Sequence, residues 1–99
     1  MKTMTYYFLV QARVNNQEEY DKYLEKVNEV FENYEGEYLA VDESPSVIEG
    51  KWDYSKTVII KFKSRNDFEK WYYSDDYQKI LKHRLAAADC DAILIEGFE

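Results

Sequence analysis

One pattern occurs twice along this chain: an apolar strand-like run, an amphipathic helix and a second strand-like run follow one another without a linker. The first unit covers residues 6–14, 17–34 and 37–42, and the second covers 57–62, 65–88 and 92–96. Two such split strand-helix-strand units share one four-stranded antiparallel sheet and place both helices on the same face. The pattern therefore predicts an α+β fold of order βαββαβ whose second sheet face carries no helix.

The length and composition of the chain limit it to one domain with short connections. Its 99 residues are enough for a single thin core, since a chain of this size buries roughly 60 to 70 per cent of its unfolded surface. With 3 Gly and 1 Pro, long loops are not expected. We expect residues 1–99 to form one domain.

The formal net charge of -7 comes from one part of the chain. Residues 15–50 contain eleven acidic and two basic side chains, whereas residues 51–99 contain nine of each. A negative surface repels nucleic acid phosphates and anionic lipid headgroups, so we expect neither nucleic acid nor a membrane as a partner. Cys90 is the only cysteine, and no apolar signal or membrane-spanning run is present, which favours a cytoplasmic protein.

Both helices have recognisable starts. Asn16 followed by Glu19, and Ser64 followed by Asp67, are typical of N-cap pairs. Gly36 is expected to end the first helix in the left-handed conformation. Ser74 offers a fresh N-cap and predicts a kink in the second helix. The first helix has one stripe of apolar side chains at helical spacing, formed by Tyr20, Leu24, Val27, Val30, Phe31 and Tyr34.

Turn-forming residues predict two further features of the sheet. The run 42–45, Asp-Glu-Ser-Pro, interrupts a strand that resumes at 47–50, which indicates a bent or bulged edge strand. The run 89–91, Asp-Cys-Asp, is expected to turn the chain into its last strand.

The sheet face without helices is predicted to be apolar. Alternation along the strands places Tyr7, Leu9 and Ile59 on it, together with Leu94 or Ile95. Four strands of five residues make a plane of roughly 300 Å², which approaches the largest apolar patch that a monomer exposes. We therefore expect a homodimer in which two copies stack through these faces.

Five residues are candidates for a ligand site. Glu49 and Trp52, at the end of the bent strand, have the chemistry to orient a polar ligand, or else form a strand-end ion pair and close the core. Trp71 and Tyr77 lie on the inward stripe of the second helix, where core packing is the stronger interpretation for Trp71. Arg84 shares this stripe and must be paired, either with Glu49 or Glu96 as a structural group or with a ligand carboxylate.

Sites for metals, nucleotides and activated nucleophiles are not indicated. The sequence has no metal-ligand spacing, phosphate-binding glycine loop or serine-nucleophile motif, so we expect no cofactor. His83 is one residue off the stripe, and a lone histidine on a helix is far more often inert than a haem or metal ligand. Cys90 lies between two aspartates, which do not favour its thiolate.

Several segments in order resemble the DUF1330 family of uncharacterised proteins, from about residue 6 to residue 97. The most specific are Glu49-Gly50-Lys51-Trp52 and Trp71-Tyr72-Tyr73-Ser74 with Tyr77. The run 34–39, the segment 62–64, Arg84 and the closing Ile95-Glu96-Gly97 agree as well. The resemblance implies a ferredoxin-like fold of the dimeric α/β-barrel class and no known reaction. The family usually has a basic residue where this chain has Glu37, and a glycine-containing turn where it has 42–45.

Two functions stay open on the residues alone. The first is a small-molecule-binding protein, with a cofactor-independent enzyme as one form of it, whose pocket lies between the sheet and the second helix. The second is a non-enzymatic dimeric interaction or regulatory module, in which the aromatic residues serve only core and subunit contacts. The sequence does not decide whether the protein is an enzyme.

Overall fold

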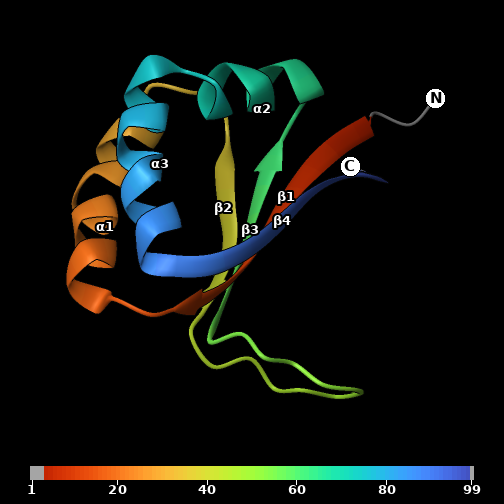
Figure 1. The fold of residues 1–99 in the computed structure, drawn as a ribbon. Coiled ribbons are helices and arrows are strands. Elements are labelled where there is room, and N and C mark those ends of the chain that lie inside the picture. Colours follow the sequence, from red (N-terminus) through yellow and green to blue (C-terminus); the bar gives the residue numbers. More distant parts are fainter. Residues whose placement is uncertain (1–3, 99) are drawn as a thin grey trace.

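The computed structural model describes residues 4–98 as two layers, a sheet and a set of helices packed on one of its faces (Figure 1). The elements in chain order are β1 (Met4–Val14), α1 (Gln17–Phe31), β2 (Glu37–Asp42), β3 (Lys56–Phe62), α2 (Arg65–Tyr72), α3 (Asp75–Ala87) and β4 (Ala88–Phe98). The sheet order is β2-β3-β1-β4, and all neighbouring strands are antiparallel. This confirms the α+β, βαββαβ arrangement that the repeated unit predicts.

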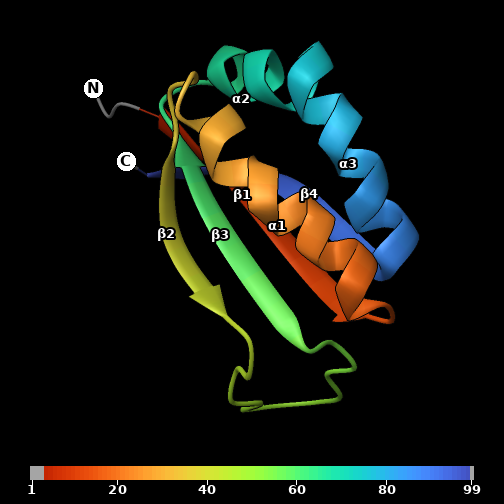
Figure 2. The same cartoon turned by 90° about the vertical axis from the view of Figure 1, so that its left-hand side faces the viewer.

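The helix α1 begins where the N-cap pair predicts. The Asn16 side chain accepts a hydrogen bond from the backbone N–H of Glu19 at 3.1 Å, which satisfies one donor of the first turn. One face of the helix is buried against the sheet, and Figure 2 shows α1 lying across it. The buried residues of α1 are Tyr20, Tyr23, Val27 and Phe31.

The end of α1 differs from the prediction. The helix stops at Phe31, before the expected end at residue 34, and Gly36 does not have a left-handed backbone; within residues 4–98, Gly50 is the glycine with positive φ, 79°. Gly36 is required for space instead, because a Cβ there would lie 2.6 Å from the Phe31 ring and 2.7 Å from the Phe62 ring.

The kink predicted at Ser74 is confirmed as a break between α2 and α3. Ser74 caps α3 by accepting a hydrogen bond from the Tyr77 backbone N–H at 3.2 Å, and Ser64 caps α2 through the N–H of Asp67 at 3.0 Å. The break turns α3 so that it runs beside α1 over the sheet (Figure 2). Within residues 4–98, no helix is long and apolar enough to span a bilayer.

Two predicted connections are wrong, and a long loop is present that the low glycine and proline content did not predict. β2 is an edge strand with an irregularity, as predicted, but the irregularity lies between Tyr38 and Ala40. The strand ends at Asp42 and does not resume at 47–50, because residues 43–55 form the long loop. The run 89–91 is not a turn, because it belongs to β4 and pairs with 11–13 of β1. Backbone pairing along the whole of β1 outweighs the turn preference of the two aspartates.

The core between the layers is dominated by aromatic rings. Phe62, Trp71 and Tyr77 are the largest fully buried side chains. Trp71 contacts Phe62 in a stacked arrangement with ring centroids 5.6 Å apart, and its centroid lies 4.2 Å from that of Tyr77. A smaller cluster of Ala12, Tyr20, Ala87 and Ala88 closes the other end of the helix layer.

The second face of the sheet carries no helix, as predicted. Register pairing places Tyr7 beside Ile95, and Leu9 between Ile59 and Ile93, on this face. Ile93 and Ile95 are both exposed, whereas Leu94 points to the other side and packs against the core. The sequence left Leu94 and Ile95 open for this face, and the structure selects Ile95. The name open face is used below for this surface.

Candidate functional site

A cavity of about 290 Å³ lies between the sheet and the helix layer. It is lined mainly by apolar and aromatic side chains, with two cationic groups among them. Its position agrees with the predicted pocket between the sheet and the second helix, and α1 supplies a further wall. The lining residues are Phe8, Val10, Tyr20, Tyr23, Leu24, Val27, Asn28, Tyr38, Val41, Lys56, Val58, Ile60, Trp71, Tyr77 and Arg84.

Arg84 is the buried cation of this cavity. The residue is 4 % exposed, and its Nε and Nη1 atoms have no hydrogen-bond partner in the described chain. Its Cζ lies 5.6 Å from the centroid of the Tyr23 ring, so the guanidinium rests on an aromatic face. An arginine keeps its charge at any working pH, and a buried charge without a counter-ion is costly. The arrangement calls for an anion.

Two tyrosine hydroxyls adjoin this cation. Those of Tyr23 and Tyr77 lie 2.8 Å apart and form a buried hydrogen bond between α1 and α3. Burial raises the pKa of Tyr77, while the charge of Arg84 acts in the opposite direction. Burial also raises the pKa of Tyr23 well above its ordinary value, and raises that of Tyr38 to about 12. All three phenols are therefore protonated near neutral pH. Since the Tyr23 and Tyr77 hydroxyls share one hydrogen bond, one of these two keeps a proton that can be donated to a ligand.

Trp71 contributes another buried donor. Its indole Nε1 is buried and has no hydrogen-bond partner among the described residues, although an indole N–H usually finds one when buried. Trp71 and Arg84 both line the cavity, and both have buried N–H groups without a hydrogen-bond partner among the described residues. Donors without acceptors favour a ligand that carries oxygen atoms as acceptors.

The charge of the cavity lining is opposite to that of the whole chain. Lys56 and Arg84 are its charged members, and no Asp or Glu among the described residues lines it. Lys56 is buried, its Nζ lies 4.8 Å from the Tyr20 ring centroid, and burial lowers its pKa while the carboxylate of Glu43 acts against that shift. A protein with net charge -7 therefore places positive charge inside its cavity, which suits a negatively charged small molecule.

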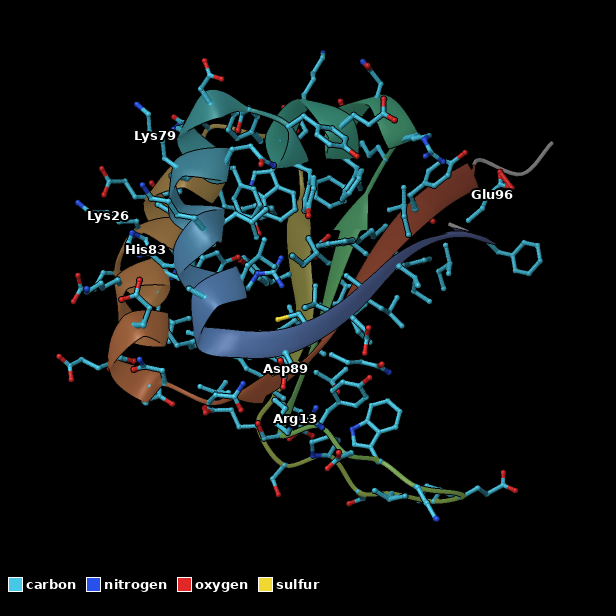
Figure 3. The ribbon with its side chains drawn as sticks, in the orientation of Figure 1. Arg13, Lys26, Lys79, His83, Asp89 and Glu96 are labelled. Carbon is cyan, nitrogen blue, oxygen red and sulfur yellow. The ribbon has the colours of Figure 1, made fainter. Side chains whose placement is uncertain are left out.

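The structure brings three of the five predicted residues together. Trp71, Tyr77 and Arg84 share the cavity wall, whereas Glu49 and Trp52 lie in the loop 43–55 and line a separate depression there. The predicted alternative of a structural ion pair for Arg84 is not found in residues 4–98, since no salt bridge joins it to Glu49 or Glu96. Glu96 lies far along β4 (Figure 3), where the Tyr6 hydroxyl contacts it at 3.3 Å.

Sequence reasoning missed Tyr23 and Lys56. The predicted stripe of α1 used Leu24, which is 38 % exposed, although helical spacing from Tyr20 and Val27 admits residue 23 equally well. Lys56 was not among the candidates; it is the first residue of β3 and pairs with Ala12. Alternation along this strand places Lys56 on the sheet face that is covered by the helices, and this pattern could have identified it as a residue of the cavity.

The other titratable candidates lie away from the cavity. His83 is on the outer side of the helix layer (Figure 3), where its Nδ1 lies 2.5 Å from the Glu19 carboxylate. Cys90 is a partly buried residue of β4 beside the small alanine cluster. Among residues 4–98 there is no cluster of His, Cys, Asp and Glu that would hold a metal ion.

Fold and cavity together define a ferredoxin-like α+β protein with a partly open, cation-lined pocket between sheet and helices. The model of the family described as "Domain of unknown function (DUF1330)" matches residues 5–98, so the chain belongs to this family and the resemblance seen in the sequence is confirmed. No curated protein is similar enough to match the sequence.

Three solved structures illustrate the fold. The RPA0582 protein of unknown function from Rhodopseudomonas palustris has a TM-score of 0.78 at 21% identity, covering 99% of this chain and 84% of that one. SnoaB, a cofactor-independent oxygenase from Streptomyces nogalater, has a TM-score of 0.62 at 11% identity, with coverage of 100% and 96%. A dimeric ferredoxin-like protein of unknown function from Thermobifida fusca has a TM-score of 0.62 at 10% identity, with coverage of 97% and 92%. At these identities the likeness shows the fold alone.

Proposed function

We propose that this protein binds a small organic acid in its internal cavity, with the ligand carboxylate on Arg84 and its apolar body among the aromatic side chains. The observation that carries the proposal is the buried Arg84 guanidinium with two nitrogens unpaired. Guanidinium and carboxylate match as a two-pronged, charge-assisted pair, and such a pair is stronger in a water-poor site. The Trp71 indole N–H and the Tyr77 hydroxyl supply further donors for ligand oxygens.

The volume of the cavity limits the size of the ligand. Benzene occupies an apolar cavity of about 150 Å³ in a well-studied engineered protein, and the cavity here is about 290 Å³. A ligand of roughly ten to twelve non-hydrogen atoms would fill it on that scale. Aryl-alkanoic or alicyclic monocarboxylic acids fit both this size and the apolar walls.

A cofactor-independent enzyme is the form of this function that the fold likeness supports. SnoaB carries out its oxygenase chemistry on the same fold without a cofactor, and a cavity with fixed donors is suited to stabilising negative charge that develops on a bound substrate. In this chain the Tyr23 and Tyr77 hydroxyl pair would hydrogen-bond oxygen that becomes negatively charged on a bound substrate. Binding of an acid is the first step of any such reaction and can be tested separately.

The protein works as a homodimer stacked through its open face in this proposal. Tyr7, Leu9, Ile59, Ile93 and Ile95 form the apolar part of that face, whose end near the loop 43–55 carries Arg13 and Asp91, and a neighbour of the same fold is described as dimeric. The open face is the side of the sheet opposite to the cavity, so stacking leaves the cavity intact. A purely structural module would also dimerise, but it would have no use for a buried arginine with two unpaired nitrogens beside a cavity.

The test pairs each acid with its uncharged amide. We expect acids such as 3-phenylpropionate and cyclohexylacetate to raise the melting temperature of the wild type and to give measurable heats by calorimetry, and the corresponding amides to do neither. Arg84→Met is expected to lose the response, whereas the exposed neighbour substitution Lys82→Met is expected to keep it. Equal responses of wild type and Arg84→Met to the acids would rule out the proposal.

A further inference from the structure

The loop 43–55 between β2 and β3 carries apolar side chains that the subunit leaves in water. Ile48 is 87 % exposed, Val47 is 51 % exposed and Trp52 is 39 % exposed. The loop has no helix or strand of its own. Connections longer than about 12–15 residues without secondary structure are uncommon in compact domains and are usually either functional or linker segments. Burying an exposed side chain such as Ile48 or Trp52 is favourable, so this loop has the composition of a contact surface.

The returning arm of the loop is fixed to the open face. Arg13 Nη1 donates to the backbone oxygen of Asp53 at 2.7 Å and pairs with its carboxylate at 2.5 Å, and the Tyr54 hydroxyl donates to Asp91. Arg13 and Asp91 both belong to the open face at the end of the sheet from which the loop leaves. The loop is therefore held in a definite position.

Trp52 is held by the same anchor. Its ring packs edge-on against Tyr54, with centroids 5.6 Å apart. Figure 1 shows that the loop extends past the sheet on the side away from the helices, which is the side of the open face. An aromatic residue in a fixed position on this side is suited to be an interface anchor.

We infer that this loop is an arm that grips a second copy of the same chain. The inference rests on the proposed homodimer and adds which segment of each subunit contacts the partner. The area of the open face supports this occupant: strand lengths of 6, 7, 11 and 11 residues give a plane of roughly 550 Å². A stable interface removes about 800 Å² from each partner, so the flat sheet alone is marginal and the arm supplies the remainder.

The positions of the arms select the symmetry of the dimer. Both arms project from the same end of their sheets, so a two-fold axis parallel to the strands would place the two arms against each other. A two-fold axis perpendicular to the strands, in the plane of the interface, reverses the second sheet. Each arm then lies over the end of the partner's sheet that is far from the partner's own arm. That end carries Tyr7 and the exposed Ile95, which are apolar and free of the subunit's own loop. Ile48 and Trp52 therefore pack against Tyr7 and Ile95 of the second copy.

Sedimentation equilibrium of the full chain tests the arm. We expect Trp52→Ala to weaken dimerisation at least tenfold, and Tyr73→Ala, an exposed aromatic residue between α2 and α3, to leave it unchanged. Circular dichroism checks that both variants keep the fold, because neither residue belongs to the core. If the wild type is a dimer and Trp52→Ala has the same dissociation constant, the proposed role of the loop is wrong and the stacked dimer is retained. If the wild type is a monomer, both proposals are wrong.

A double-mutant cycle tests the contact across the interface. We expect Trp52→Ala and Ile95→Ala together to weaken the dimer less than the product of their separate effects, because each removes the same contact. If the effects of the two substitutions on the dissociation constant simply multiply, the two residues are not in contact and the proposed axis perpendicular to the strands is wrong. The response of the melting temperature to 3-phenylpropionate is expected to be the same in Trp52→Ala as in the wild type, which separates failure of the arm from failure of the cavity proposal.

Discussion

Replacing Arg84 by Met is expected to stabilise the ligand-free protein. Two buried donors without partners, Nε and Nη1, cost about 1–3 kcal/mol each, and stacking on the Tyr23 ring recovers about 0.5–2 kcal/mol. Methionine has a similar length and no polar hydrogen, and replacing buried ionic groups by packed apolar ones is often stabilising by about 1–4 kcal/mol. We therefore expect the free energy of unfolding to rise by about 1–3 kcal/mol.

The assay is thermal unfolding without added ligand, followed by urea unfolding to obtain the free energy directly. For a domain of this size about 1 kcal/mol corresponds to a shift of 4–8 °C in melting temperature, so Arg84→Met is expected to melt at least about 4 °C higher. Lys82→Met, on the exposed side of the same helix, is expected to change the stability by less than about 0.5 kcal/mol. A lower melting temperature for Arg84→Met would refute the reasoning, since it would mean that Arg84 has a stabilising partner in the folded chain.

Two further predictions concern the helix layer. Ser74→Ala removes the cap between α2 and α3, and we expect it to lower the free energy of unfolding by about 1 kcal/mol in urea titrations; an unchanged value would contradict the capping role. The hydrogen bond from His83, followed by that from Lys22, holds the pKa of Glu19 below its ordinary value. A lowered carboxyl pKa stabilises the fold above the unfolded pKa, and this contribution is lost as the pH falls through the folded pKa. Glu19→Gln is therefore expected to melt below the wild type at pH 7 and to approach it near about pH 3. A melting difference that is the same at both pH values would contradict this assignment.

The sheet and helices could be predicted because they depend on local alternation and capping. Asn16, Ser64 and Ser74 mark the starts of the helices in the sequence, and all three accept the predicted hydrogen bonds. The loop 43–55 and the early start of β4 could not be predicted in this way. The start of β4 depends on pairing with β1, which outweighs the turn preferences of Asp89 and Asp91. The loop begins where the pairing of β2 with β3 ends.

The candidate site shows the same division between local pattern and topology. Helical spacing placed Tyr77 and Arg84 on the inward face of the second helix, and the structure agrees. Whether Arg84 has a counter-ion is a question of distance in three dimensions: Glu49 lies in the loop and Glu96 near the end of β4. The sequence allowed both as partners of Arg84, and only their positions in the folded chain exclude these two ion pairs.

The cationic cavity and the open face lie on opposite sides of the same sheet. A chain with a single thin core gains stability from each buried apolar group, yet this one keeps a charged cavity on one side of its sheet and exposed isoleucines on the other. Stacking two copies through the open face would offset the cost of the cavity without filling it, because the sheet separates the two surfaces. Dimer formation and ligand binding would then stabilise the fold independently. We expect the rise in melting temperature caused by the acid to add to the rise caused by higher protein concentration. A non-additive result would show that the cavity and the open face are coupled through β1 and β3.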